Sequence, residues 1–145
     1  MAIFKMDGVD GVVAYPKKFV TLYATEIITK GNVVAIDEDV STNGAGLHVC
    51  LPDAADTINA IGVAAETVAS GATIRVQVAG YNEDTTHDAT MALAAAGRLV
   101  GTTTAGLTQE LTAVNITSRA FAICVTAFGT TTNGAIMIFD HGFYG

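Results

Sequence analysis

Short apolar runs, separated by turns rich in glycine, asparagine and threonine, fill most of this chain, and this pattern predicts strands. In the clearest run, Ile74, Val76 and Val78 alternate with Arg75 and Gln77. Successive side chains of a strand point to opposite faces, so the three aliphatic residues should lie in a core and the two polar ones outside it. We therefore expect Val76→Asp to prevent folding, and Gln77→Asp to change the stability by no more than about 0.5 kcal/mol.

Further strands are predicted where β-branched and aromatic residues cluster. Their ranges are Phe19–Tyr23, Val33–Ile36, Leu47–Leu51, Ile58–Ala64, Arg98–Val100, Leu111–Ile116, Arg119–Phe128 and Ala135–Phe139. Tight turns are predicted at Lys30–Asn32, at Ser41–Gly46, whose Asn-Gly pair suits a hairpin, and at Val68–Gly71. Two threonine-rich segments, Thr102–Gly106 and Thr130–Gly134, are predicted as surface loops.

One segment fits two structures. The alanine-rich stretch Met91–Ala96 has high helix propensity, with Asp88 as a suitable N-cap and Gly97 just past the end. The alternative is a strand through Thr90–Leu93 followed by an Ala-Gly turn, and we favour it because tertiary context readily overrides alanine propensity. The sequence leaves open whether Met91–Ala96 is helix or strand.

The N-terminus differs from the rest of the chain. Its apolar residues Ile3, Phe4 and Met6 are followed at once by the turn pairs Asp7-Gly8 and Asp10-Gly11, which argues against a helix. We expect residues 1–18 to form an extended N-terminal arm and residues 19–145 to form a single β domain. A chain of 145 residues can bury a core of this size without disulfides or metal.

The composition predicts an assembly. Charged residues make up 14% of the chain, against about 25% in a typical soluble domain, and 50% of the residues are hydrophobic. A monomer with so few charges would expose large apolar patches, which usually mark contact sites. We therefore expect a homo-oligomer, most simply a homotrimer.

The net charge of −7 argues against nucleic acid as a partner, because lysine and arginine dominate phosphate binding. The first 30 residues contain all four lysines against three acids, whereas the remainder has three arginines against eleven acids. This asymmetry predicts a mildly basic end that contacts an acidic partner. A secretory signal and a membrane-spanning run are both lacking, which predicts a soluble protein made in a cytoplasm. In such a setting Cys50 and Cys124, both within apolar runs, should be buried thiols.

The sequence contains none of the catalytic, cofactor-binding or metal-binding motifs that we searched for, so we expect a protein that is not an enzyme. The histidines are far apart and no zinc-type spacing occurs. The densest titratable cluster, at residues 83–88, is predicted as a polar loop. The segment Asp7–Gly11 has the look of a calcium loop, but Lys18 stands where the closing glutamate would be required.

Three phrases resemble a known family: K-G-N-V-V-A-I-D at residues 30–37, A-I-G-V-A at 60–64, and S-G-A-T-I-R-V-Q-V-A-G at 70–80. They look like those of the small decoration, or cement, proteins that coat the heads of tailed bacteriophages. The resemblance implies an all-β fold, a compact β-barrel or β-sandwich (β-tulip-like), which binds the major capsid protein on the outer surface of the virion and stabilises the shell. As the capsid contact we expect the apolar and basic residues of the arm, namely Ile3, Phe4, Lys5, Met6, Lys17 and Lys18.

The alternative is a glycan- or receptor-binding module on a virion surface. Such sites generally stack sugars on exposed aromatic rings, and this chain has no tryptophan. The aromatic residues near predicted turns that could stack on a sugar are Tyr15, Tyr81, Phe143 and Tyr144.

Overall fold

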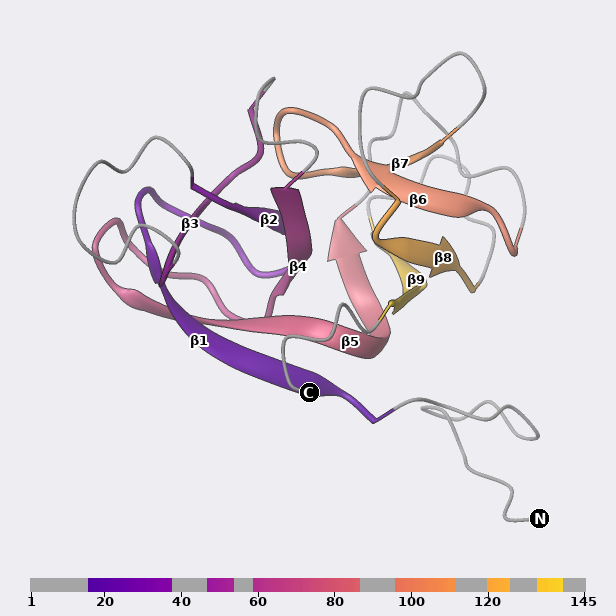
Figure 1. Ribbon diagram of the computed structural model, residues 1–145, viewed down its shortest axis with the longest axis horizontal. Coiled ribbons are helices and arrows are strands. Elements are labelled where there is room, and N and C mark those ends of the chain that lie inside the picture. Colours follow the sequence, from indigo (N-terminus) through magenta and orange to yellow (C-terminus); the bar gives the residue numbers. More distant parts are fainter. Residues whose placement is uncertain are drawn as a thin grey trace.

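The computed structural model describes residues 16–37, 47–53, 59–86, 96–111, 120–125 and 133–139, and within these ranges the regular structure is entirely β. The strands are β1 (Lys18–Ala24), β2 (Val33–Ile36), β3 (His48–Cys50), β4 (Ala60–Ala64), β5 (Thr73–Thr86), β6 (Leu99–Thr102), β7 (Thr108–Glu110), β8 (Ala122–Cys124) and β9 (Asn133–Ile138) (Figure 1). The expected all-β fold is confirmed. Within the described ranges, no helix is long and apolar enough to cross a membrane.

Five strands close into a barrel. Their order is β1-β3-β2-β4-β5, and β5 pairs back onto β1 in antiparallel register, with Leu22 opposite Ile74. Closure removes the open edges that would otherwise template aggregation. The barrel is filled by inward aliphatic side chains, among them Leu22, Val34, Ile74 and Val76. The predicted barrel is therefore present, and Val76 lies in its core as expected.

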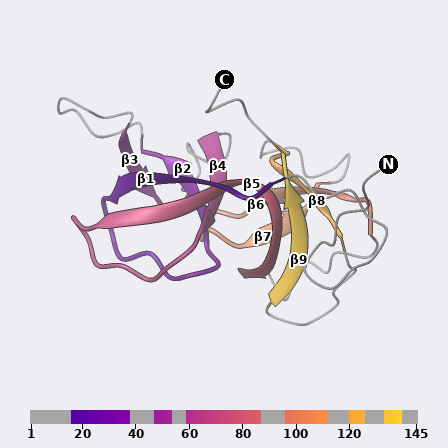
Figure 2. The same cartoon turned by 90° about the horizontal axis from the view of Figure 1, so that it is seen from below.

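The long strand β5 links the barrel to a second sheet. Up to Ala79 it pairs with β1 and β4, and from Gly80 onward it pairs with β9. Gly80 has φ of 91°, a left-handed conformation that glycine adopts without strain, and it marks the change of partner. The second sheet continues in the order β5-β9-β8-β6-β7, and Figure 2 shows β5 between its strands and those of the barrel.

The second sheet covers one outer wall of the barrel. Val33 of β2 and Val63 of β4 point outward from the barrel and are fully buried against Val100, Phe121 and Ile136. The packing of outward aliphatic side chains on a second layer makes the barrel and the sheet one two-layer unit.

The barrel contains an internal repeat with a spacing of 40 residues. Segments 24–36 and 64–76 each run from a strand end, through a glutamate and a Gly turn, into the next strand. The backbone bonds are reciprocal: Ile28 N–H donates to Val68 O at 3.1 Å, and Val68 N–H donates to Ile28 O at 2.9 Å. The turns exchange bonds in the same way, since Gly31 N–H donates to Ala64 O and its counterpart Gly71 N–H donates to Ala24 O. A pseudo-two-fold axis therefore passes between the two halves of the barrel.

Most strands and turns predicted within the described ranges are confirmed, with shifts of one or two residues at most ends. The strand predicted at Arg119–Phe128 is shorter: β8 spans Ala122–Cys124, and residues 119 and 126–128 lie outside the described residues. The strand expected at Leu111–Ile116 lies, apart from Leu111, outside the described residues, and β7 at Thr108–Glu110 was not predicted. The first two residues of β7, Thr108 and Gln109, are buried, and Gln109 Nε2 donates to Thr102 O at 2.6 Å across the hairpin. A strand with buried polar side chains lacks the apolar pattern from which we predicted strands. β5 also runs on through the predicted polar loop as far as Thr86.

Gln77 corrects the sequence prediction. It lies on the face opposite Val76, as alternation requires, but it is only 3% exposed. Its Nε2 donates to Ala79 O at 3.1 Å and to Tyr81 O at 2.9 Å, and its Oε1 accepts from Asn82 Nδ2 at 3.0 Å. The bend at Gly80 folds β5 back over this side chain, so the expectation that Gln77→Asp is tolerated is wrong.

Several predictions concern positions outside the described residues. These are the course of the arm over residues 1–15, the turn at Ser41–Gly46, the loop at Thr130–Gly134 except for its last two residues, which lie in β9, and the choice between helix and strand for all of Met91–Ala96 except its last residue. The end of that last segment is described: Ala96 and Gly97 form a turn, with φ of 84° at Gly97. β1 begins at Lys18, the last residue that we assigned to the arm.

Candidate docking surface

A shallow open depression of about 170 Å³ lies where the start of β1 meets the bend of β5 and the turn at Lys30. Two ion pairs line it. Lys17 Nζ lies 3.1 Å from Glu83 Oε2, and Lys30 Nζ lies 3.1 Å from Asp84 Oδ2. Lys17 Nζ also lies 6.0 Å from the ring centroid of Tyr81. The depression therefore gathers charges of both signs from three separate segments of the chain.

These ion pairs are exchangeable. All four side chains are substantially exposed, and exposed pairs of this kind contribute at most about 1 kcal/mol and weaken with salt. A partner that offered its own carboxylates could therefore replace Glu83 or Asp84 at little cost.

Arg75 and Phe19 form the rim of the depression on the barrel side. The Arg75 guanidinium carbon lies 4.8 Å from the Phe19 ring centroid, a cation–π contact. The backbone N–H of Arg75 donates to Glu66 Oε1 at 2.9 Å. The guanidinium itself makes no ion pair with a carboxylate among the described residues. Arg75 thus presents an uncompensated positive charge beside an exposed aromatic ring.

Buried amides form the floor of the depression and are satisfied within the protein. Asn82 Oδ1 accepts from Asp84 N–H and from Thr85 Oγ1, both at 2.9 Å, and Asn82 Nδ2 donates to Gln77. A floor whose donors and acceptors are already paired offers little to a small polar substrate. The arrangement suits a protein surface that docks rather than a pocket that reacts.

The two thiols lie away from this surface. Cys50 and Cys124 are buried and form no disulfide, which confirms the prediction of buried thiols. Burial raises the pKa of the Cys124 thiol, and the nearby Glu110 carboxylate adds to the shift. The raised pKa keeps Cys124 in the unreactive thiol form at neutral pH. Among the described residues, no group of three or more His, Cys, Asp or Glu side chains could hold a metal ion.

The structure describes two of the six expected capsid-contact residues. Lys17 lines the depression, and Lys18 begins β1, with its Cα paired to that of Ala79. The other four, Ile3, Phe4, Lys5 and Met6, lie outside the described residues.

Sequence reasoning missed the exposed aromatic residues of β1. Phe19 is 38% exposed and Tyr23 is 47% exposed, and the Tyr23 ring lies 5.6 Å from that of His48. The alternation of Phe19 and Tyr23 with Val20 and Leu22 could have revealed them, because the aliphatic set fills the barrel and leaves the aromatic set outside. Tyr81, which we considered as a sugar-stacking residue, is buried at 8% exposure, so that assignment is wrong.

Comparison with known proteins shows which known fold this chain resembles. No family model matches the chain, and no curated protein matches it either. Among solved structures, the chain is similar to the N base of head fiber gp8.5 of bacteriophage phi29. The TM-score is 0.57 at 15% sequence identity, over 86% of this chain and 96% of that one. The chain shares its fold with a phage head-fiber base. At this identity the likeness establishes the fold alone.

Proposed function

We propose that this protein is a structural component of a tailed-bacteriophage virion, a decoration protein that binds the outer surface of the assembled head and stabilises it. The observation that carries the proposal is the fold shared with the phi29 head-fiber base, which extends over 96% of that chain. The three phrases that resemble cement proteins support it independently, because they form the turns and strands β2, β4 and β5 of the barrel.

The mechanism is linkage. A protein that binds the closed shell and not its dispersed subunits stabilises the shell by mass action. A homotrimer that touches several copies of the major capsid protein at once would add modest contacts through avidity. The exchangeable ion pairs at Lys17 and Lys30 fit this role, since each lysine can turn from an internal carboxylate to one on the shell.

The arm and the start of β1 provide the proposed contact. Ile3, Phe4 and Met6 supply apolar anchors, and Lys5, Lys17 and Lys18 supply positive charge next to them. Deletion of residues 1–10 should leave the fold intact, because turn-rich termini contribute little to a core. The same deletion should strongly reduce binding to heads.

Two assays on decorated and undecorated heads test the proposal. Heads that carry the protein should release their DNA at a higher temperature than heads that lack it. Equal thermal release together with impaired adsorption to cells would favour the receptor-binding alternative and overturn the stabilising role. A truncated protein lacking residues 1–10 that still decorates heads at unchanged occupancy would refute the contact assignment.

A further inference from the structure

The internal repeat makes the two outer walls of the barrel directly comparable. On one wall, Val33 and Val63 are 0% exposed because the second sheet covers them. The residues 40 positions away in the repeat are Thr73 and Tyr23, and both are exposed. One wall is therefore buried within the chain, while its symmetry counterpart remains open.

We call this counterpart the open face and define it as Phe19, Thr21 and Tyr23 of β1 with Thr73 and Arg75 of β5. The strand register places Thr21 opposite Arg75 and Tyr23 opposite Thr73, so the five side chains form one continuous patch. All five are exposed. Aromatic residues and arginine are the types most enriched among residues that dominate binding energy at protein interfaces.

Charge indicates what covers the open face. Within the described part of the chain the Arg75 guanidinium makes no ion pair with a carboxylate, whereas Lys17, Lys30 and Arg98 each lie within 3.4 Å of one. Beyond residue 30 the chain contains three arginines against eleven acids, so each copy offers an excess of carboxylates. A second copy of this chain therefore supplies the charge that the open face requires.

The same charge disfavours one arrangement. A two-fold contact of the open face with itself would bring two Arg75 guanidinium groups into one interface to which the five residues of the face contribute no carboxylate, and like charges in one interface oppose association. A head-to-tail contact avoids this, because the open face of one copy meets a different surface of the next, and the chain has eleven acids beyond residue 30 from which that surface can draw. Such contacts close into rings when the rotation permits.

We propose that the open face is the cationic, aromatic half of a head-to-tail interface between copies of this chain, with Arg75 and Tyr23 as its anchors. The inference deepens the oligomeric part of the proposed function, and it does not depend on what the oligomer binds.

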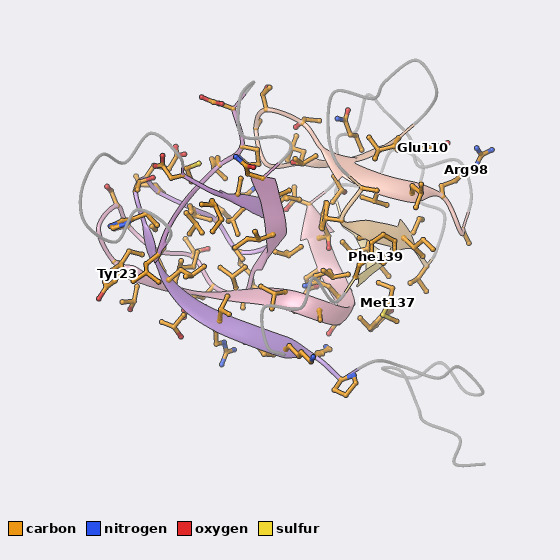
Figure 3. All side chains as sticks on the ribbon, viewed as in Figure 1. Tyr23, Arg98, Glu110, Met137 and Phe139 are labelled. Atoms are coloured by element: carbon orange, nitrogen blue, oxygen red, sulfur yellow. The ribbon has the colours of Figure 1, made fainter. Side chains whose placement is uncertain are left out.

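Light scattering on purified full-length protein across micromolar concentrations tests the interface. The wild-type protein should be a trimer, and Arg75→Glu should raise the dissociation constant at least thirtyfold, a loss in the range of interface anchor residues. Tyr23→Ser, which changes no charge, should also weaken the trimer. The control is Arg98→Glu, which makes the same charge change at an exposed residue just before β6, far from Tyr23 (Figure 3), and which also removes the ion pair with Glu110. The control should remain trimeric.

Three outcomes would overturn the interface. A monomeric wild type that still decorates heads would refute it and leave the proposed function intact. A trimeric Arg75→Glu variant that no longer binds heads would assign the open face to the capsid instead. If Arg75→Glu and Arg98→Glu weakened the trimer equally, the effect would depend on net charge and not on the open face. Since Arg75 and Tyr23 are both exposed, far-UV circular dichroism of the variants should match that of the wild type.

Discussion

The buried Gln77 side chain offers a sharp test of the bend that joins the barrel to the second sheet. Gln77→Glu changes no side-chain volume but replaces the Nε2 donor with a carboxylate oxygen. That oxygen would lie about where Nε2 now donates to Ala79 O and Tyr81 O, at 3.1 and 2.9 Å. The carboxylate would face two carbonyl oxygens with no donor between them, so the charged form is disfavoured.

The magnitude follows from linkage. Burial raises the pKa of a glutamate by up to 3–5 units, and the donor that remains, Asn82 Nδ2 on the other carboxylate oxygen, keeps the shift below that limit. Each unit corresponds to about 1.36 kcal/mol. If the folded pKa is about 7 and the unfolded pKa about 4.3, the charge destabilises the fold by roughly 3.7 kcal/mol above pH 8. Because the folded pKa is raised, the loss grows as pH rises from the unfolded pKa through the folded one. Between pH 5.5 and pH 8 the variant should lose about 2 kcal/mol relative to the wild type.

Urea unfolding at both pH values, at one fixed protein concentration, measures this difference. Thr104→Glu is the control, because it adds a carboxylate at the exposed tip of the turn between β6 and β7. The control should show no extra pH dependence. A Gln77→Glu variant as stable as the wild type at pH 8 would refute the buried amide network and the folding of β5 over it.

Two further tests use pairs of sites within the chain. Gly31 and Gly71 occupy equivalent turns with φ of 90° and 80°, but a Cβ on Gly31 would lie 2.5 Å from Asp84 O whereas one on Gly71 meets nothing within 4 Å. In urea unfolding, Gly71→Ala should lower the free energy of unfolding by about 1–2 kcal/mol, and Gly31→Ala should lower it by about 1–3 kcal/mol more. Equal losses in the two variants would contradict the close packing of the turn at Gly31. The Cys124 thiol should react with iodoacetamide at pH 8 far more slowly in the folded protein than in urea. Glu110→Gln should lower the pKa of the Cys124 thiol, because it removes the nearby negative charge. Rapid alkylation of the folded protein would show that the thiol is accessible.

Local patterns predicted the barrel well because β1 and the first part of β5 alternate inward and outward residues, and β2 and β4 are short apolar runs next to turns. Ile74 and Val76 lie in the core, and the turns at Gly31 and Gly71 have the positive φ angles that their glycines permit. These features depend on neighbours in the sequence, so the sequence contains them directly.

The burial of Gln77 could not be predicted in the same way. Alternation placed it on the face opposite Val76, which is correct, but what covers that face is set by the bend at Gly80 three residues later. A strand that changes partners at a glycine looks like a strand that ends there. The polar run that follows, which contains Glu83 and Asp84, reinforced that interpretation although it continues β5.

The docking surface was only partly within reach of the sequence. Lys17 and Lys18 were singled out by the clustering of lysines near the N-terminus. The pairing of Lys17 with Glu83 spans 66 residues, and no local pattern indicates it. Arg75 was recognised as outward-facing, but its contact with Phe19 depends on the closure of β1 onto β5.

The repeat also explains why the two outer walls of the barrel carry different chemistry. Val33 and Val63 are aliphatic, which suits a wall that is covered permanently by the same chain as it folds. Tyr23 and Arg75, at the matching wall, are amphipathic or charged, which suits a surface that must tolerate water before it meets a partner. If the open face were exposed throughout the life of the protein, small polar residues would serve there as well as an aromatic ring. Its composition therefore favours a surface that is exposed in the free chain and covered after assembly.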